Sequence, residues 1–445
     1  MPNADTIAAV ATAQGRGGVG VVRISGHEVR KIAEGILGSL PKARHATYAD
    51  FVDDKGDILD QGIALYFSAP HSYTGEEVLE LQGHGGHAVL QMILQRCIDL
   101  GARLAQPGEF TRRAFLNNKI DLAQAESVAD LIDANSREAA RSAMRSLRGE
   151  FSSAIRELVD ALIHLRMLVE AMLDFPEEQV DSMDLQRRDA LLRDVRQKLQ
   201  RTLDKAKQGS LLREGAHIVI AGQPNVGKSS LLNKLSGEEV ALVSDIPGTT
   251  RDAIRQAIQL HGVPLHIIDT AGLRESDDEV ENLGIALTRQ TLHRADLILL
   301  VLDASQGLTV GDEAIIAGLP SEIPRLLIFN KSDLLGGKSP VQMGGENGIL
   351  VSAKTGSGLE ELRGKLLEAL GWRASESGAF MARERHLRAL QETLHHLQQA
   401  HDVLSGAELF AEELRLAQRA LSEITGEFGS DDLLGEIFSR FCIGK

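Results

Sequence analysis

Cysteine is scarce in this chain, which contains only Cys97 and Cys442. Two cysteines cannot supply a disulfide framework, so we expect a reducing, cytoplasmic location. Cys442 stands between Phe441 and Ile443, where we expect a small buried hydrophobe, although a reactive thiol remains open.

Long apolar runs are missing as well. No uninterrupted stretch approaches the roughly 18 residues that a membrane span needs. The opening residues, MPNADTIAAV, place no basic region ahead of an apolar core. We therefore expect neither a secretion signal nor a membrane partner.

Positive charge is also in deficit, because 48 Lys and Arg face 63 Asp and Glu and leave a formal net charge of −15. This balance argues against broad, nonspecific binding of nucleic acid. A local basic face is a separate matter. In REAARSAMRSLRGE, arginines recur every three or four residues and would share one face of a helix: Arg137, Arg141, Arg145 and Arg148. That face is either merely solvated or in contact with RNA phosphates, and the sequence leaves both readings open.

Three kinds of pattern follow one another along the chain. Residues 1–117 mix short β-like runs, such as GVVRIS and EVLELQGHGG, with Gly-rich turns and the helical stretch AVLQMILQRCIDLGA, which indicates an α+β domain. Residues 118–213 follow a helical period, with apolar stripes through Phe151 to Met172 and through Leu192 to Leu203.

From residue 214 to 372, buried-strand runs alternate with helices, which predicts a parallel sheet covered by helices. The helical period returns over 373–445, including Leu387 to Leu404 and Phe410 to Ile424. We predict a multidomain α/β protein in which an α/β domain is inserted into a discontinuous helical domain.

The α/β region contains a phosphate-binding motif. GQPNVGKS, residues 222–229, fits G-x-x-x-x-G-K-S between an apolar strand and the helical run SSLLNKLSG. Its backbone N–H groups and Lys228 would hold the phosphates, and the Ser229 hydroxyl would bind Mg²⁺. This context predicts a Ras-like P-loop domain that binds a nucleoside triphosphate.

Three further elements select GTP. Asp269 in DTAG would support the Mg²⁺ shell, and the Gly272 amide would meet the γ-phosphate. In NKSD, residues 330–333, the Asp333 carboxylate suits the paired N–H donors of guanine, a pair that adenine lacks. SAK, residues 352–354, offers backbone donors to the guanine O6.

Between the first two elements, SDIPGTTRD offers Thr250 as the switch threonine that closes on Mg²⁺. The residues expected to contact GTP are these: Asn225, Val226, Gly227, Lys228, Ser229, Ser230, Ser244, Asp245, Ile246, Pro247, Gly248, Thr249, Thr250, Asp269, Thr270, Ala271, Gly272, Asn330, Lys331, Ser332, Asp333, Ser352, Ala353 and Lys354.

Two features need separate treatment. GRGGVG, residues 15–20, matches the dinucleotide fingerprint, but a β-like run follows where the fingerprint needs a helix, so we expect no NAD or FAD there.

Leu273 follows DTAG at the place where Ras-type proteins carry a water-orienting glutamine. Another group must therefore handle the attacking water and the transition-state charge if GTP is hydrolysed.

Several long stretches resemble the MnmE (TrmE) family of tRNA modification GTPases across essentially the whole chain. They are GRGGVGVVRISG, HSYTGEEVLELQGHGG, QPGEFTRRAFLNNKIDLAQAESVADLIDA, GQPNVGKSSLLN, SDIPGTTRD, DTAGLRES and FCIGK. The resemblance implies an N-terminal dimerisation and folate-binding domain over 1–117, and a helical domain formed by 118–213 and 373–445 around a GTPase domain at 214–372.

The resemblance also implies how the missing glutamine is replaced. A potassium ion would supply the positive charge, held by Asn225, the carbonyls of Ser244 and Ile246, and Thr249. The loop carrying the last three would be ordered only when two GTPase domains meet, so hydrolysis would depend on dimerisation. Glu281 resembles a water-orienting base, although a solvated acidic residue is the other reading, and Lys228 and Thr250 complete the catalytic set.

The remaining implications concern the modification chemistry. A homodimer would join the FAD-dependent protein MnmG in a heterotetramer or larger assembly, with FAD only on that partner. Together they would add an aminomethyl or carboxymethylaminomethyl group to the wobble uridine of tRNA, using a tetrahydrofolate one-carbon donor. The folate contacts would fall on Arg23, Glu80, Lys119 and Lys445.

Two other functions stay open on the residues alone. One is a GTP switch in ribosome or RNA assembly without modification chemistry, and the N-terminal folate-type segment argues against it. The other is a one-carbon transferase that works alone, with GTP only as an allosteric ligand. No second chemical centre in the sequence supports that function.

Overall fold

The computed structural model describes residues 5–13, 15–174, 182–236, 256–269, 295–336, 348–373, 378–402, 407–426, 431–439, 441–442 and 444. The chain divides into two compact units. Unit 1 comprises Met1–Ile132, Ser146–Val195 and Glu392–Lys445, and unit 2 comprises Asp133–Arg145 and Arg196–Gln391.

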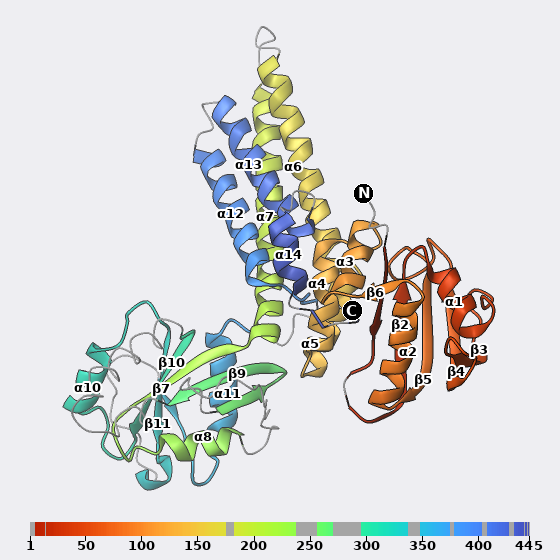
Figure 1. The fold of residues 1–445 in the computed structure, drawn as a ribbon. Coiled ribbons are helices and arrows are strands. Elements are labelled where there is room, and N and C mark those ends of the chain that lie inside the picture. The colour runs from red at the N-terminus through yellow and green to blue at the C-terminus, as the bar shows by residue number, and fades with distance from the viewer. Residues whose placement is uncertain are drawn as a thin grey trace, which may run out of the picture. The chain divides into compact units, whose positions relative to one another are not determined.

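A six-stranded sheet begins unit 1 (Figure 1). Its strands are β1 (Thr6–Val10), β2 (Gly17–Ser25), β3 (Thr47–Val52), β4 (Ile58–Phe67), β5 (Val78–Gly85) and β6 (Ala102–Leu104), in the spatial order β3-β4-β5-β2-β1-β6. β1 pairs in parallel with β6, and the other pairs are antiparallel.

Two helices cover this sheet, α1 (Val29–Leu37) and α2 (His87–Asp99). Side chains of period two on the strands meet side chains of period 3.6 on the helices in one core, where Val22, Leu81, Ile32 and Ile93 are fully buried. Cys97 belongs to this core, and burial raises the pKa of its thiol to about 12, against a smaller opposing effect of Arg96. The α+β prediction for this region is confirmed.

The glycine-rich run at residues 15–20 leads into β2, which starts at Gly17. A strand therefore stands where a dinucleotide fingerprint needs a helix, as the sequence indicated.

Helices make up the rest of unit 1. They are α3 (Glu109–Leu116), α4 (Leu122–Ile132), α6 (Glu150–Asp174), α13 (Ala407–Thr425), α14 (Asp431–Ser439) and parts of α7 (Ser182–Glu214) and α12 (Glu384–Asp402). α6 and α13 lie side by side although the α/β region separates them in sequence (Figure 1). The Arg166 Nη1 donates to Gln418 Oε1 across this pair at 2.6 Å. The predicted discontinuous helical domain is confirmed.

The stripe predicted on α6 holds for most of its length. Phe151, Ile155, Leu158, Leu162 and Leu165 are buried, but Val169, not Leu168, continues the buried row. Five turns of 3.6 residues span 18 residues, so the position that lies five turns after Phe151 on the same helix face is 169 and not 168.

Unit 2 contains a second six-stranded sheet. Its strands are β7 (Ala216–Ala221), β8 (Gln256–Leu260), β9 (Val263–Asp269), β10 (Leu297–Asp303), β11 (Arg325–Asn330) and β12 (Ile349–Leu350), in the order β12-β11-β10-β7-β9-β8. Its described helices include α5 (Arg137–Leu147, mostly in this unit), α8 (Lys228–Ser236), α10 (Val310–Ala317), α11 (Leu359–Ala369) and the remaining parts of α7 and α12, with the 3₁₀ turn η2 (Ser332–Leu335).

All strand runs read from the sequence pair in parallel, as predicted, and β10 is buried along its whole length. β8 corrects the expectation of a wholly parallel sheet, because it pairs with β9 antiparallel through a tight turn at His261 and Gly262. The parallel register places the carboxyl ends of β7, β10 and β11 at one edge.

No helix among the described residues has both the length and the apolar character needed to cross a membrane.

Close packing within unit 2 yields a test of its stability. A Cβ at Gly209, inside α7, would lie 1.8 Å from the Phe380 carbonyl oxygen, whereas one at Gly364, inside α11, would meet nothing within 4 Å. Gly209→Ala should lower the free energy of unfolding by about 1–3 kcal/mol through overpacking. Gly364→Ala should raise it by roughly 0.5–1 kcal/mol, because alanine restricts the unfolded chain.

The fluorescence of Trp372, the only tryptophan, reports on urea unfolding of this unit. A rise of the midpoint in both variants would contradict the close approach at Gly209.

Candidate functional site

The loop between β7 and α8 has a backbone that only glycine fits at two positions. Gly222 and Gly227 have φ of 144° and 93°. A Cβ on Gly222 would lie 2.2 Å from the Val301 carbonyl oxygen, and one on Gly227 would lie 2.3 Å from Asn330 Nδ2. The loop is thus wound tightly, as a loop whose backbone N–H groups cradle phosphates must be.

Lys228 and Ser229 follow directly at the start of α8, where a helix N-terminus favours anions. The buried Lys228 ammonium donates to the carbonyls of Gly222 at 2.9 Å and Gln223 at 2.8 Å, so it is held inside the loop. Ser229 and Asn225 are exposed, and Asn225 has a positive φ of 64°. A hydroxyl and an amide oxygen presented to solvent are oxygen donors of the kind that Mg²⁺ and K⁺ bind.

The buried Asn330 connects this loop to the SAK loop. Its Nδ2 donates to the Val226 carbonyl at 2.9 Å, and its Oδ1 accepts the backbone N–H of Ala353 at 3.0 Å. In the register of the sheet, Asn330 pairs with Asp303 at the ends of β11 and β10. The phosphate loop and the base loop therefore share one amide.

The base loop places an exposed carboxylate beside the SAK segment. Ser352 Oγ donates to Asp333 Oδ1 at 2.6 Å, while Asp333 itself is exposed. This bond fixes the carboxylate and leaves Oδ2 and a second lone pair of Oδ1 available to two donors. Guanine offers two such donors on one edge, so the arrangement is suited to guanine.

Lys331 reinforces the same loop with an ion pair. Its Nζ lies 2.8 Å from Asp303 Oδ2, and its φ of 66° turns the chain after β11. Burial alone would raise the pKa of the Asp303 carboxyl, but the bonds from Lys331 and Ser305 outweigh burial and hold the pKa below its usual value. The carboxylate is thus charged at neutral pH.

Several predicted site residues lie outside the described residues. They are Ser244, Asp245, Ile246, Pro247, Gly248, Thr249, Thr250, Thr270, Ala271, Gly272, Glu281 and Lys445. For Asp269 the backbone is described, and it pairs with Ile220 beside the start of the phosphate loop.

Unit 1 contains the second predicted site. Arg23 on β2 donates through Nε to Glu80 Oε1 on β5 at 2.9 Å, and its Nη1 lies 3.5 Å from the carbonyl of Gly444. Two predicted residues and the C-terminal segment therefore meet. The guanidinium also lies 5.6 Å from the ring centre of Tyr73 and 5.8 Å from that of Phe110.

Tyr73 and Phe110 were not among the predicted residues. Tyr73 belongs to the stretch HSYTGEE, which carries the family resemblance, but an aromatic residue next to an arginine 50 positions away has no signal in a single sequence. Burial raises the pKa of the Tyr73 hydroxyl, which lies 2.8 Å from Thr111 Oγ1.

Lys119 and Cys442 are two further residues that the sequence analysis singled out in unit 1. Lys119 donates to the Pro70 carbonyl at 3.0 Å, so it lies beside the segment that carries Tyr73. Cys442 is exposed, which corrects the expectation of a small buried hydrophobe. Its neighbour Phe441 is buried and takes that place, packing on Phe438 with ring centres 5.5 Å apart.

Comparison with known proteins identifies the family. The model of the MnmE helical domain matches residues 122–442, and that of the GTP-binding protein TrmE N-terminus matches residues 6–119. The tRNA modification GTPase MnmE of Thiobacillus denitrificans is 59% identical over 100% of this chain and 99% of that protein. The chain belongs to the MnmE family.

Other MnmE proteins are similar to the same extent. The tRNA modification GTPase MnmE of Nitrosospira multiformis is 57% identical, with 100% of both chains covered. Among solved structures, Era of Aquifex aeolicus bound to GDP·AlF₄⁻ is 27% identical over 41% of this chain and 66% of its own, with a TM-score of 0.29. Membership in the MnmE family follows from the full-length relatives.

The bridge made by Asn330 can be tested directly. Asn330→Ala leaves the Val226 carbonyl and the Ala353 N–H without their buried partner, at a cost of about 1–3 kcal/mol each. GTP affinity, measured by calorimetry on the full-length protein, should fall at least about tenfold.

Ser321→Ala, at an exposed serine of unit 2 outside the predicted GTP contacts, serves as the control and should bind GTP as the unmodified protein does. Unchanged affinity in the Asn330 variant would show that the two loops hold their arrangement without the amide.

Proposed function

We propose that this protein is a potassium-dependent GTPase, activated when two GTPase domains meet, that acts with an FAD-dependent partner of the MnmG type on tRNA. The pair would add an aminomethyl or carboxymethylaminomethyl group to the wobble uridine, with a tetrahydrofolate derivative as one-carbon donor. The observation that carries the proposal is full-length similarity to proteins named tRNA modification GTPase MnmE. The phosphate and base loops of unit 2 and the cluster around Arg23 in unit 1 add to it.

The GTP site supports the proposed GTPase activity. Lys228 would hold the phosphates from inside the loop, the exposed Ser229 hydroxyl would bind Mg²⁺, and Asp333 would read guanine. Thr250 and Glu281 keep their proposed roles as switch threonine and water-orienting base. Mg²⁺ would neutralise phosphate charge in this site.

Asn225 supports the proposed dependence on potassium. Leu273 can neither donate to nor accept from a water and carries no charge, so the water and the transition-state charge must be handled by other groups. The amide of Asn225 is exposed at the phosphate loop and fits an alkali cation shared with Ser244, Ile246 and Thr249. In systems with an arginine finger, such added charge accelerates hydrolysis by roughly 10³ to 10⁵.

The cluster around Arg23 supports the proposed binding of a tetrahydrofolate derivative. Its guanidinium suits a carboxylate tail, the Glu80 carboxylate suits the donor edge of a pterin, and the aromatic rings provide flat apolar walls. Lys119 and Lys445 would add positive charge. A GTP switch that only assists RNA assembly has no need of such a cluster.

Potassium dependence can be tested with Asn225→Ala. GTP turnover of the unmodified protein should be higher in potassium than in sodium buffer and should rise more than linearly with protein concentration, because two copies must meet. Asn225→Ala should lose the potassium stimulation while GTP affinity stays within about threefold, since the amide contacts the ion rather than the base. Turnover that is the same in both salts and linear in concentration would refute this half of the proposal.

Folate binding can be tested with Arg23→Ala. Loss of a charge-assisted hydrogen bond costs about 1.5–3 kcal/mol, so binding of tetrahydrofolate, measured by calorimetry, should weaken at least about tenfold. Arg30→Ala removes an exposed arginine of the same sheet region, paired with Glu77, and should have no effect. Equal folate affinity in the two variants would remove Arg23 from the site.

A further inference from the structure

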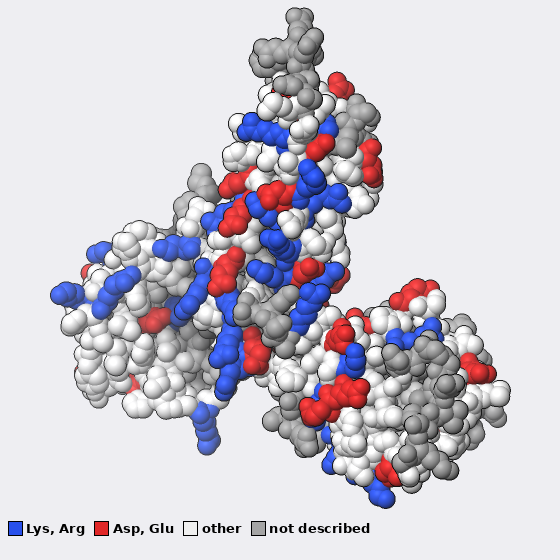
Figure 2. All heavy atoms as spheres, turned by 180° about the vertical axis from the view of Figure 1, so that it is seen from behind, with Lys and Arg blue, Asp and Glu red and all other residues white. Residues whose placement is uncertain are grey.

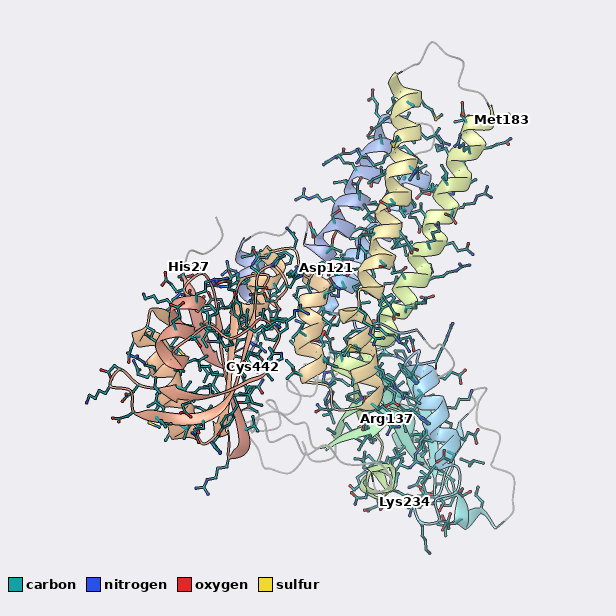
Figure 3. The ribbon with its side chains drawn as sticks, turned by 90° about the vertical axis from the view of Figure 1, so that its right-hand side faces the viewer. His27, Asp121, Arg137, Met183, Lys234 and Cys442 are labelled. Atoms are coloured by element: carbon teal, nitrogen blue, oxygen red, sulfur yellow. The ribbon has the colours of Figure 1, made fainter. Side chains whose placement is uncertain are left out.

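Four exposed cations lie on two helices of unit 2: Arg137 and Arg141 on α5, and Arg201 and Lys205 on α7. Each pair is spaced by four residues and so shares one helix face. Within the part of the chain that the structure describes, none of the four forms an ion pair. Figure 3 places Arg137 at the first turn of α5.

Several exposed basic residues elsewhere in the chain have acidic partners. Arg415 lies 2.7 Å from Glu412, and Lys365 lies 2.9 Å from Glu368. In such pairs on one helix the two opposite charges neutralise each other locally. The four cations on α5 and α7 differ because their charge is not compensated in this way.

A short segment without helix or strand, residues 378–383, contacts α5. Ser142 Oγ donates to the Ala379 carbonyl at 3.2 Å, and Arg145 Nη1 lies 3.4 Å from the same oxygen. Arg141 precedes Arg145 by one turn on that face. The arginine row predicted from the sequence is therefore anchored at Arg145 and exposed at Arg137 and Arg141.

The same segment fixes α7. A Cβ at Gly209 would lie 1.8 Å from the Phe380 carbonyl, so helix and segment are in direct backbone contact. Lys205 Cε lies 3.9 Å from the Cβ position of Gly378. Lys205 lies near Gly378, and Arg145 lies near Ala379, the next residue of the segment. The segment therefore links the part of α7 that carries Arg201 and Lys205 with the part of α5 that carries Arg137 and Arg141.

We propose that this surface, formed by Arg137, Arg141, Arg201 and Lys205, binds the phosphate backbone of the tRNA substrate; the inference rests on the proposed function. RNA presents regularly spaced negative charges, and uncompensated Arg and Lys on helices are the groups that contact them. Figure 2 shows Lys and Arg side chains gathered along the helical part of the chain on the face in view. Because phosphates carry no base identity, the surface positions the tRNA and does not select its sequence.

The test uses the full-length protein and a fluorescently labelled, unmodified tRNA transcript. The quadruple variant Arg137→Ala, Arg141→Ala, Arg201→Ala and Lys205→Ala should bind it about tenfold or more weakly near 0.1 M salt. The slope of log affinity against log salt should become shallower by roughly 3, since each lost phosphate contact removes about 0.7–0.9. Basal GTP turnover should stay unchanged.

The control variant removes the same number of charges from paired sites. It carries Lys365→Ala, Arg388→Ala, Arg415→Ala and Arg419→Ala, whose partners are Glu368, Glu384, Glu412 and Glu423. It should bind the transcript with an unchanged salt slope. A general effect of net charge would weaken both variants equally and would overturn the inference.

Two further results separate this inference from the proposed function. If the unmodified protein binds the transcript and the quadruple variant binds it equally with the same slope, the surface is not an RNA site and the proposed function stands. The same holds if the variant keeps RNA but loses the FAD-dependent partner, which would make the surface a protein interface. If the unmodified protein binds no transcript at all, the tRNA part of the proposed function fails as well.

Discussion

The amide of Asn330 donates to the Val226 carbonyl of the phosphate loop and accepts the Ala353 N–H of the base loop. The bond to Val226 is buried and the bond from Ala353 is partly buried, so loss of the amide would leave polar groups with little access to compensating water. The parallel register brings the ends of β10 and β11 level and places Asn330 beside Asp303. Phosphate recognition and base recognition are therefore not independent sites, because one side chain fixes the distance between them.

A buried charge has the corresponding role in unit 1. The Arg113 side chain is only 2% exposed and contacts Asp5, Glu76 and Glu109 at 2.9, 3.1 and 3.0 Å. Burial would raise the pKa of Glu109, but the arginines around it lower that pKa, so the carboxylate stays charged. Removing Arg113 would take away the ion-pair partner of Glu76, while Asp5 and Glu109 would keep only Arg103 among the described residues. The network joins the N-terminal strand to the segment that carries Tyr73, and in this way it supports the cluster around Arg23.

Local patterns predicted the parts of the fold that depend on neighbouring residues. Strand runs and the glycine spacing of residues 222–229 gave the parallel strands and the tight loop, because a buried strand or a wound loop constrains its own sequence. The antiparallel strand β8, the exposure of Cys442 and the rings of Tyr73 and Phe110 against Arg23 depend on residues far apart in the chain. A single sequence carries no signal for such contacts, and there family resemblance supplied only part of the site.

Net charge and local charge lead to opposite expectations in this molecule. A net charge of −15 opposes nonspecific attraction to nucleic acid over distance, yet the field near a surface depends on which cations are paired within a few ångströms. Where Arg415 faces Glu412, two opposite charges cancel beyond a Debye length. Where Arg201 and Lys205 lie one turn apart on α7 and neither forms an ion pair among the described residues, their fields add. An acidic protein can therefore hold RNA at one place while repelling it elsewhere, which favours a defined orientation over accumulation.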